Sequence, residues 1–273
     1  MRKIYAQNLS LIITERCNFN CAHCMRGESS NKVMSDDVIS ATLDQFEYIQ
    51  NLTICGGEIT LALNTLEKVF SYIIFNHIKI DMVNMVINGS IYSEKFLTLL
   101  DYMERYINLN NRRGNQSVVN FVVSWDDYHY NEADRLGILS SYLENIKKYK
   151  LNTHFKGLQK LGNKLFAEGN ALKLDSSMLS VMKPITPQVT YVGRFNRFDM
   201  KNGRCNIGPS IAVNVDGVIT ECDASTLNQN TIYNYGNVLC DSIEDVSLGR
   251  GVLVRKPRKW FKATYDEIEK YKK

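Results

Sequence analysis

Three cysteines, Cys17, Cys21 and Cys24, lie within one eight-residue segment near the start of the sequence. Three thiolates at this spacing on one loop can ligate three irons of a four-iron cluster, which normally takes four cysteines. The fourth iron would then be open to another ligand. The alternative is a zinc site completed by His23 or by a more distant residue, and unrelated thiols rarely fall so close together. The spacing therefore favours an iron–sulfur cluster.

The surrounding sequence predicts the elements that position this loop. Short apolar runs alternate with segments of helical periodicity, which is typical of strand–helix units in a parallel sheet with right-handed crossovers. The expected strands are 9–14, 52–55, 82–87, 118–124, 151–155 and 164–167. The expected helices have their apolar faces within 38–49, 63–74, 96–107 and 136–146. Ser35 is suited to cap the first of these helices.

Further polar and glycine motifs follow the expected strands. After the cysteine loop behind the first strand, the second, third and fourth strands end in Gly56-Gly57-Glu58, Asn88-Gly89, and Ser124 with Asp126. In parallel α/β sheets, ligands bind at the C-terminal ends of the strands. All of these candidate residues are therefore expected at one edge of one sheet.

Together these motifs resemble those of the radical S-adenosylmethionine (SAM) superfamily over roughly residues 9–171. Gly56-Gly57-Glu58 is similar to the GGE motif of that family, and Gly169-Asn170-Ala171 is loosely similar to its Gly-Arg-Ala. The resemblance implies an α/β fold, a partial TIM-like (β/α)6 barrel with a [4Fe–4S] cluster at its mouth. It also implies that SAM binds the open iron and is cleaved reductively to a 5′-deoxyadenosyl radical, which abstracts a substrate hydrogen.

The resemblance assigns roles to individual residues. Cys17, Cys21 and Cys24 would hold the cluster. Glu58 would accept a hydrogen bond from the methionine ammonium of SAM, and Gly56 and Gly57 would let the backbone approach the ligand. The full set of expected cofactor-binding residues is His23, Gly56, Gly57, Glu58, Asn88, Ser124 and Asp126. The side chain of His23 is equally compatible with simple packing of the loop.

Two residues beside the Gly-Gly-Glu motif depart from the family pattern. Ile59 stands where a proline is common, and Cys55 stands where threonine or serine is common. Neither change removes an expected ligand contact. We expect Cys55 to fill space in the core, with a redox thiol facing the active site as the alternative.

A second group of cysteines, Cys205, Cys222 and Cys240, lies later in the chain. The pattern Cys205-x11-Gly217-x4-Cys222 resembles the Twitch domain, the short form of the SPASM auxiliary-cluster domain. Asp216-Gly217 between two apolar runs predicts a β-hairpin that brings Cys205 and Cys222 to one end. We therefore expect these cysteines to hold an auxiliary iron–sulfur cluster. Cys240 is either a third ligand or a free thiol that donates a hydrogen atom to the substrate.

The distribution of proline indicates where one domain ends. Proline is absent from the first 183 residues and occurs four times afterwards. We expect a radical SAM core over 1–195, a Twitch-like domain over 196–250 and a basic helix or tail over 251–273. The segment from residue 250 to 273 contains nine Lys/Arg and only three Asp/Glu, whereas the whole chain has a net charge of +4. A solvated terminal helix is the favoured interpretation, with a surface for an acidic peptide or nucleic acid as the alternative.

Composition excludes several classes of protein. The sequence contains neither an apolar run long enough to span a membrane nor a signal-peptide pattern. Its seven cysteines are an odd number, three of them clustered, unlike a secreted disulfide scaffold. We expect a cytoplasmic protein with neither a membrane partner nor a nucleic-acid partner.

Three functions fit these observations. The favoured one is a radical SAM enzyme, an oxidoreductase or lyase that modifies a small molecule or nucleotide-like metabolite and takes electrons from a flavodoxin or ferredoxin. The second is a maturase that cross-links, epimerises or oxidises a ribosomally made peptide. The third is a non-catalytic metal-binding module, which the Gly-Gly-Glu motif argues against because such a module needs no SAM site.

Overall fold

The computed structural model describes residues 4–111, 117–160, 165–166, 169–180, 188–190, 206–208, 210–220, 235–243 and 246. Its first elements are β1 (Ile4–Thr14), α1 (Asp36–Leu43), β2 (Phe46–Gly56), η1 (Ile59–Leu61), α2 (Leu63–Phe75), β3 (Lys79–Ile87), α3 (Glu94–Asn111) and β4 (Val119–Ser124). These are followed by α4 (Asp127–Arg135), α5 (Leu139–Lys150), β5 (Phe155–Gln159), β6 (Leu165–Phe166), η2 (Gly169–Lys173), η3 (Ser176–Met178) and β7 (Leu179–Ser180). The last ones are β8 (Gln188–Thr190), β9 (Asn206–Gly208), β10 (Ile211–Val213), β11 (Val218–Thr220) and β12 (Gly236–Asn237).

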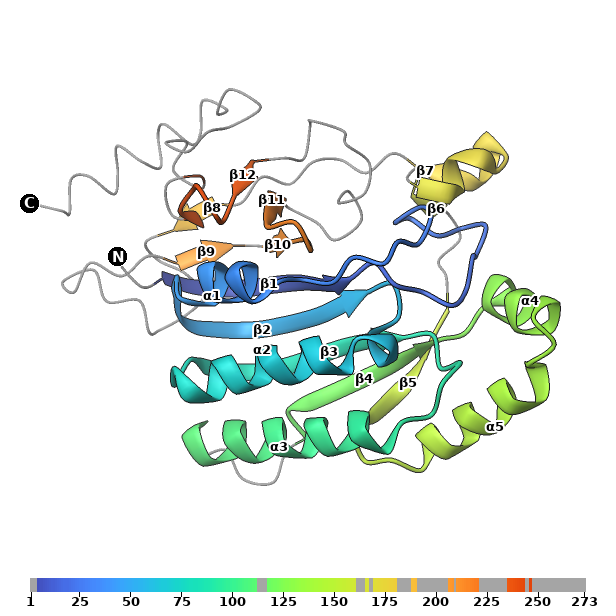
Figure 1. Cartoon of the computed structure of the whole chain (residues 1–273), viewed down its shortest axis with the longest axis horizontal. Helices are drawn as coiled ribbons and strands as arrows, with labels where there is room; N and C mark the ends of the chain where they lie inside the picture. Colours follow the sequence, from blue (N-terminus) through green and yellow to red (C-terminus); the bar gives the residue numbers. More distant parts are fainter. Residues whose placement is uncertain are drawn as a thin grey trace, which may run out of the picture.

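The central feature is an open sheet in the order β12-β11-β10-β1-β2-β3-β4-β5. Strands β1 to β5 are parallel to their neighbours, and a helix precedes each of β2 to β5 (Figure 1). This arrangement confirms the expected α/β class and the open parallel sheet of a partial barrel. The register pairs Thr14 with Gly56 and Ile87 with Val123, so the C-terminal ends of β1 to β4 lie at one edge.

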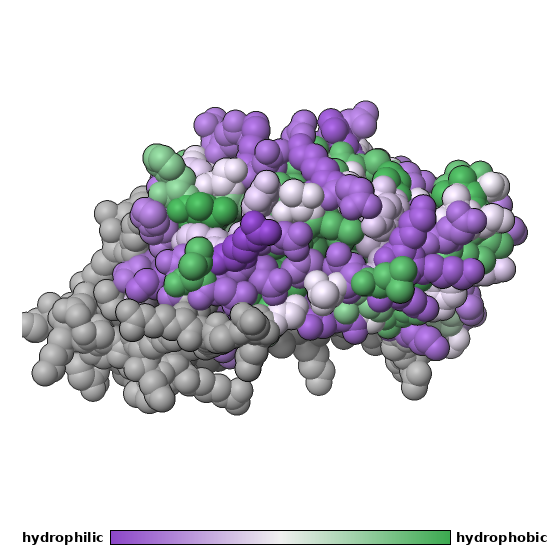
Figure 2. All heavy atoms as spheres, turned by 90° about the horizontal axis from the view of Figure 1, so that it is seen from below, coloured by the Kyte–Doolittle hydropathy of each residue, from purple (hydrophilic) through white to green (hydrophobic). Residues whose placement is uncertain are grey.

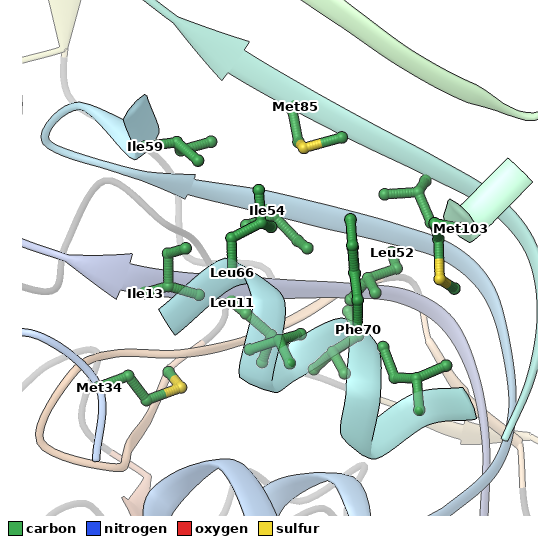
Figure 3. Close-up of a cluster of buried hydrophobic side chains, with 14 of the residues drawn as sticks. Leu11, Ile13, Met34, Leu52, Ile54, Ile59, Leu66, Phe70, Met85 and Met103 are labelled. Carbon is green, nitrogen blue, oxygen red and sulfur yellow. The ribbon is translucent and has the colours of Figure 1, made fainter. Parts of the chain in front are cut away.

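The core lies between this sheet and the helices that cover it. Leu11, Leu52, Ile54 and Met85 extend from β1, β2 and β3 toward Leu66 and Phe70 of α2 (Figure 3). These side chains are at most 2% exposed. Burial of each is worth about 1.5–3 kcal/mol, so the core fixes the strands whose ends carry the candidate site.

Two helix boundaries differ from the sequence prediction. Phe46 and Ile49 fit the helical spacing of α1, but that helix ends at Leu43 and both residues lie in β2. The helix expected over 136–146 begins only at Leu139, as α5, because Gly137, with a φ of +69°, separates it from α4, which the sequence did not predict. Phe46 and Ile49 are both buried in β2, so a three-residue spacing of apolar residues also occurs in a buried strand.

The strands predicted after 150 are also displaced. Leu151 is the C-cap of α5 and 88% exposed, and β5 begins at Phe155. The strand expected at 164–167 is present as Leu165–Phe166, but it pairs with β7 in a separate two-stranded sheet. The prediction of a sixth parallel strand beside β5 is therefore wrong for the described residues.

The predicted β-hairpin is confirmed. Strands β10 and β11 are antiparallel, and Gly217 has the positive φ, +82°, that its turn requires. The hairpin continues the main sheet, because β10 pairs in parallel with β1, Leu9 opposite Ile211. Cys205, Cys222 and the basic segment 251–273 lie outside the described residues.

The surface of the described part is mixed in character. The face seen in Figure 2 is largely hydrophilic, with hydrophobic side chains in separate small groups. None of the helices within the described ranges is long and apolar enough to cross a membrane.

Candidate active site

The loop after β1 brings its three cysteines to one cavity. Cys17 and Cys24 are half-buried, Cys21 is buried, and all three thiols are free. They line a cavity of about 440 Å³ together with the Gly56-Gly57 turn, as expected from their places at the strand ends. This volume is within the range of small-molecule sites.

The cysteine thiols are in an environment that disfavours a bare thiolate. Burial raises the pKa of Cys17 to about 11, and the nearby Glu58 carboxylate and Cys24 thiol act in the same direction. Burial also raises the pKa of Cys21 well above its ordinary value. A bound cation reverses this preference, because metal coordination deprotonates a thiol outright. The thiols of Cys17 and Cys21 therefore suit a cationic metal centre better than an empty cavity.

The Gly-Gly turn packs directly against the cysteine loop. A Cβ on Gly57 would lie 2.3 Å from the carbonyl oxygen of Arg16, and one on Gly56 would lie 2.6 Å from that of Thr14. The turn is also hydrogen-bonded to the end of β1, since the N–H of Gly57 donates to Thr14 O at 2.8 Å. Both glycines line the cavity, but the close approach that requires them is to the chain itself.

Glu58 is fully buried, and protein donors occupy both of its carboxylate oxygens. Oε1 accepts the N–H and the hydroxyl of Thr60, at 3.0 and 2.6 Å, and Oε2 accepts the N–H of Asn88 at 2.5 Å. Burial is the largest influence on its carboxyl group and raises the pKa. Glu58 thus joins the end of β2 to the end of β3. Its hydrogen bond to the ammonium of SAM stays a prediction.

Asn88 continues this connection to the cysteine loop. Its Nδ2 donates to Asn18 Oδ1 at 3.1 Å and lies 3.8 Å from Cys17 Sγ, within reach of a hydrogen bond to sulfur. Its Oδ1 accepts the N–H and the hydroxyl of Ser90. The side chain of Asn88 is therefore engaged on every side by protein groups.

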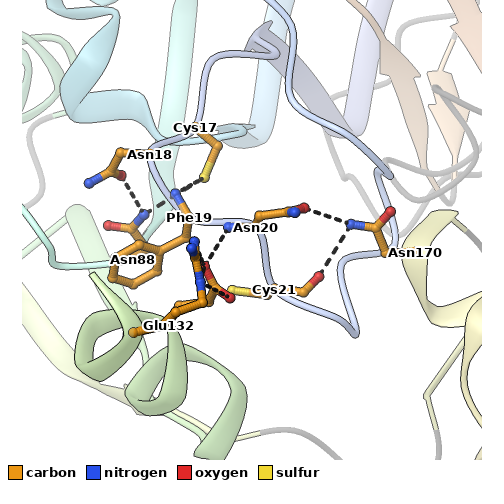
Figure 4. Close-up of polar contacts among 9 residues, drawn as sticks. Cys17, Asn18, Phe19, Asn20, Cys21, Asn88, Glu132 and Asn170 are labelled. Carbon is orange, nitrogen blue, oxygen red and sulfur yellow. Dashed lines mark hydrogen bonds and ion pairs between the residues drawn. The ribbon is translucent and has the colours of Figure 1, made fainter. Parts of the chain in front are cut away.

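Two residues that the sequence analysis did not place there also hold the cysteine loop (Figure 4). Glu132 of α4 accepts the N–H of Asn20 at 3.0 Å. Asn170 donates its side-chain amide to Asn20 Oδ1 and Cys21 O, both at 3.3 Å, and its N–H to Cys24 O at 2.8 Å. The cysteine loop is thus hydrogen-bonded to two separate elements, α4 through Glu132 and the segment after β6 through Asn170.

Asp126, His129 and His23 lie together beside the cavity. Asp126 caps α4, because its Oδ1 accepts the N–H groups of Tyr128 and His129. Its Oδ2 lies 2.9 Å from Nδ1 of His129, and the two histidines pair with it to lower its pKa despite the opposing effect of burial. A carboxylate can only accept, so Nδ1 of His129 carries the proton of this bond. His129 and His23 line the cavity, whereas Asp126 supports them.

The ring of His23 packs on Tyr128 at a centroid distance of 4.5 Å. Burial lowers the pKa of His23 to about 4, so the ring is neutral at pH 7. Its Nδ1 is buried and has no hydrogen-bond partner among the described residues. His23 therefore packs the loop and also presents an unsatisfied polar atom beside the cavity.

The profile of the Radical SAM superfamily matches residues 11–161, more than half of the chain. The protein belongs to the radical SAM superfamily. Members of this family use a [4Fe–4S] cluster and S-adenosylmethionine. The matched segment contains the cysteine loop, the Gly-Gly-Glu turn and the ends of β3 and β4.

Several solved structures are similar to this radical SAM protein. Native anSMEcpe with bound AdoMet and Cp18Cys peptide aligns with a TM-score of 0.49 and 16% identity, over 96% of this chain and 88% of that one. Streptococcus suis SuiB bound to precursor peptide SuiA aligns with a TM-score of 0.43 and 12% identity, over 89% of this chain and 64% of that one. No curated protein matches the sequence.

The described residues fit the two cofactors of the radical SAM family. Three thiols converge on one cavity, the buried Nδ1 of His23 has no hydrogen-bond partner in the described part of the chain, and the cavity has room for a small molecule. Ser124 also lines this cavity, at the end of β4. The candidate residues brought together around it are Cys17, Cys21, Cys24, His23, Gly56, Gly57, Asn88 and Ser124.

Two further cysteines can be placed relative to the site. Cys55 is 4% exposed, lines the cavity and packs against Ile12 and Ala212, as expected of a core residue. Nη2 of Arg26 donates to its sulfur at 3.2 Å. Cys240 is exposed and lies in the turn after β12, and its role as a ligand or hydrogen donor stays a prediction.

Proposed function

We propose that Cys17, Cys21 and Cys24 ligate three irons of the family's cluster and that the protein is a SAM-dependent radical enzyme. Cys17, Cys21 and Cys24 would hold this cluster, which would supply one electron, received from a flavodoxin or ferredoxin, for the reductive cleavage of SAM to methionine and a 5′-deoxyadenosyl radical that abstracts a substrate hydrogen. The convergence of the three thiols with the Gly-Gly turn on one cavity carries this proposal.

The chain's own residues bind and position the reacting groups. The cysteine loop is held by contacts with Asn88, Glu132 and Asn170, so the thiols are presented on a fixed backbone. The polar groups proposed to face SAM are the backbone of Gly56 and Gly57, Ser124, and His23 together with its backbone. Asp126 contributes by orienting His129 toward the same cavity.

The first test is the iron content of the anaerobically reconstituted protein, compared with that of Cys17→Ala/Cys21→Ala/Cys24→Ala. We expect a loss of about four irons per chain in the triple variant, together with loss of 5′-deoxyadenosine formation from SAM under strong reductant. Cys55→Ala is the matched control, because Cys55 lines the same cavity but lies outside the cysteine loop. Zinc in place of iron, or unchanged iron in the triple variant, would overturn the proposal.

The same measurement addresses the later cysteines. We propose that Cys205 and Cys222 hold an auxiliary cluster in a Twitch-like domain at about 196–250. A wild-type protein with about eight irons that falls to about four in the triple variant would support this. A fall from about four to none would reject it. Unchanged iron in Cys240→Ala would exclude Cys240 as a required ligand.

For the substrate, we propose a small molecule or nucleotide-like metabolite, with a ribosomally made peptide as the alternative. Formation of 5′-deoxyadenosine above the background rate, measured with metabolite and peptide fractions separately, tests this choice. If only peptide fractions increase the formation of 5′-deoxyadenosine, the substrate is a peptide, and the proposed cleavage of SAM still holds.

A further inference from the structure

The amide of Asn88 has an orientation that the surrounding groups fix. Its Oδ1 lies 2.9 Å from the N–H and 2.6 Å from the hydroxyl of Ser90. A flipped amide would place its NH2 group against the N–H of Ser90, two donors facing each other. The NH2 group must therefore face the cysteine loop, where it meets Asn18 Oδ1 at 3.1 Å and Cys17 Sγ at 3.8 Å.

The backbone of Asn88 is fixed as firmly as its side chain. The fully buried carboxylate of Glu58 accepts its N–H at 2.5 Å. Asn88 itself is only 5% exposed. Cys17 also receives a backbone donor, the N–H of Phe19 at 3.4 Å from its sulfur. Two N–H groups therefore point at this one sulfur, and the side-chain donor is the one that mutation can remove.

We propose that Asn88 is a positioning residue that holds the thiolate of Cys17 and raises the reduction potential of the cluster through an N–H···S hydrogen bond. This inference rests on the proposed function, in which Cys17 is a cluster ligand. A hydrogen bond to a ligating sulfur withdraws electron density from the cluster and stabilises the reduced form, which carries one more negative charge. Because Glu58 holds the backbone of Asn88, the Gly-Gly-Glu turn is thereby connected to the residue that influences the potential at which the cluster accepts an electron.

The chain offers a matched control in Asn170. This asparagine is also buried, at 7% exposed, and also donates its amide to the cysteine loop. The partners of this amide are oxygens, namely Asn20 Oδ1, Cys21 O and Gly27 O, at 3.3 to 3.4 Å. Asn170→Asp therefore removes a loop contact and adds a negative charge, as Asn88→Asp does, without removing a bond to sulfur.

The experiment is a potentiometric titration of the reconstituted full chain, followed by the EPR signal that addition of SAM perturbs. We expect Asn88→Asp to retain its iron and shift the midpoint potential to more negative values, by more than Asn170→Asp does. Equal shifts of the midpoint potential in the two variants would mean that the added negative charge alone causes them, and this would overturn the inference. An unchanged potential in Asn88→Asp would also overturn it.

A second variant keeps the test decisive where Asn88→Asp loses its iron. Ser90→Ala removes the hydroxyl, one of the two donors that fix the Asn88 amide, and leaves both asparagines in place. We expect a smaller shift in the same direction, and an unchanged potential there would count against the inference. Wild-type protein without iron would instead refute the proposed function, and the inference with it. Iron with wild-type potential in every variant would refute the inference alone.

Discussion

The carboxylate of Glu58 accepts the backbone N–H of Asn88 at 2.5 Å, so one acidic side chain joins the ends of β2 and β3. Glu58 has 0% exposure, and its other oxygen accepts both donors of Thr60. The Gly-Gly-Glu turn is thus a structural junction of the site as well as a candidate for binding SAM. This double role leads to the first prediction.

We expect Glu58 to make stability depend on pH. Burial raises its pKa above the ordinary 4.5, so the folded protein binds a proton more tightly at this group than the unfolded chain does. Stability from this group is therefore greatest at low pH and is lost as pH rises from about 4.5 through the raised pKa. Denaturant unfolding of wild type and Glu58→Gln between pH 4 and 9 measures the difference.

In this series the stability of wild type should decline relative to that of Glu58→Gln as the pH rises. Glu67→Gln, which replaces a half-exposed carboxyl on α2 paired with Lys95, is the control for the substitution of a carboxyl by an amide. A difference between wild type and Glu58→Gln that grows in favour of wild type with pH would contradict the predicted direction.

Gly57→Ala should remove the junction between the Gly-Gly turn and the cysteine loop. The new Cβ would lie 2.3 Å from Arg16 O and 3.0 Å from the Cβ of Cys17, so the backbone must separate. We expect a loss of about 3 kcal/mol in stability and a lower iron content. Denaturant unfolding and iron analysis measure both.

Gly137→Ala is the control for this glycine. It has a positive φ, +69°, and nothing within 4 Å of an added Cβ, so only backbone strain of about 1–2 kcal/mol is expected, with normal iron. Equal losses of iron in the two variants would show that the contact with Arg16 is unimportant.

Glu132→Ala should loosen the cysteine loop. The N–H of Asn20 donates to Oε2 of Glu132 at 3.0 Å, and a hydrogen bond to a charged group contributes about 1.5–3 kcal/mol. We expect hydrogen exchange of the Asn20 amide to accelerate at least roughly tenfold, as measured by mass spectrometry of peptides covering the loop. Arg135→Ala breaks the ion pair with Glu132 but leaves the bond to Asn20, so exchange there should change little.

His154 should contribute to stability without affecting the site. Its ring is 1% exposed, with Nδ1 3.1 Å from Val119 O and Nε2 2.7 Å from Asp101 Oδ1. His154→Phe fills the same space but removes both bonds, and we expect a loss of about 2 kcal/mol in the free energy of unfolding. Iron content and cleavage of SAM should equal those of wild type. A variant that unfolds like wild type would show that these bonds are energetically neutral.

The edge of the sheet that carries the site could be predicted because it follows from local patterns. Each motif directly follows an apolar run, and parallel strands bring their C-terminal ends together, so Cys17, Gly57 and Ser124 had to meet. The assignment of Phe46 and Ile49 to a helix failed because three-residue spacing also occurs in a buried strand. The chain turn at Asp44 and Gln45, which decides between them, has no glycine or proline to mark it.

The contacts that hold the cysteine loop were not predictable in the same way. Glu132 and Asn170 reach Asn20 from 112 and 150 residues away. Glu132 lies in no recognisable motif, and the similarity of Gly169-Asn170-Ala171 to the family's Gly-Arg-Ala does not indicate a contact with Asn20. His129 could have been found, because Asp126 is a good helix cap and places a histidine in the first turn of α4. Which atoms those side chains bond depends on the packing of β4 and α4 against the loop.

The pairing of β10 with β1 has a consequence for synthesis of the protein. Leu9 and Ile211 are adjacent in the sheet, yet they leave the ribosome about 200 residues apart, which at 5–20 residues per second is roughly 10–40 s. During that interval β1 can pair with β2 on one side while its other edge remains bare. An unpaired edge invites pairing with other chains, so nascent chains halted before residue 211 should be the form of this protein most prone to aggregate and most dependent on chaperones.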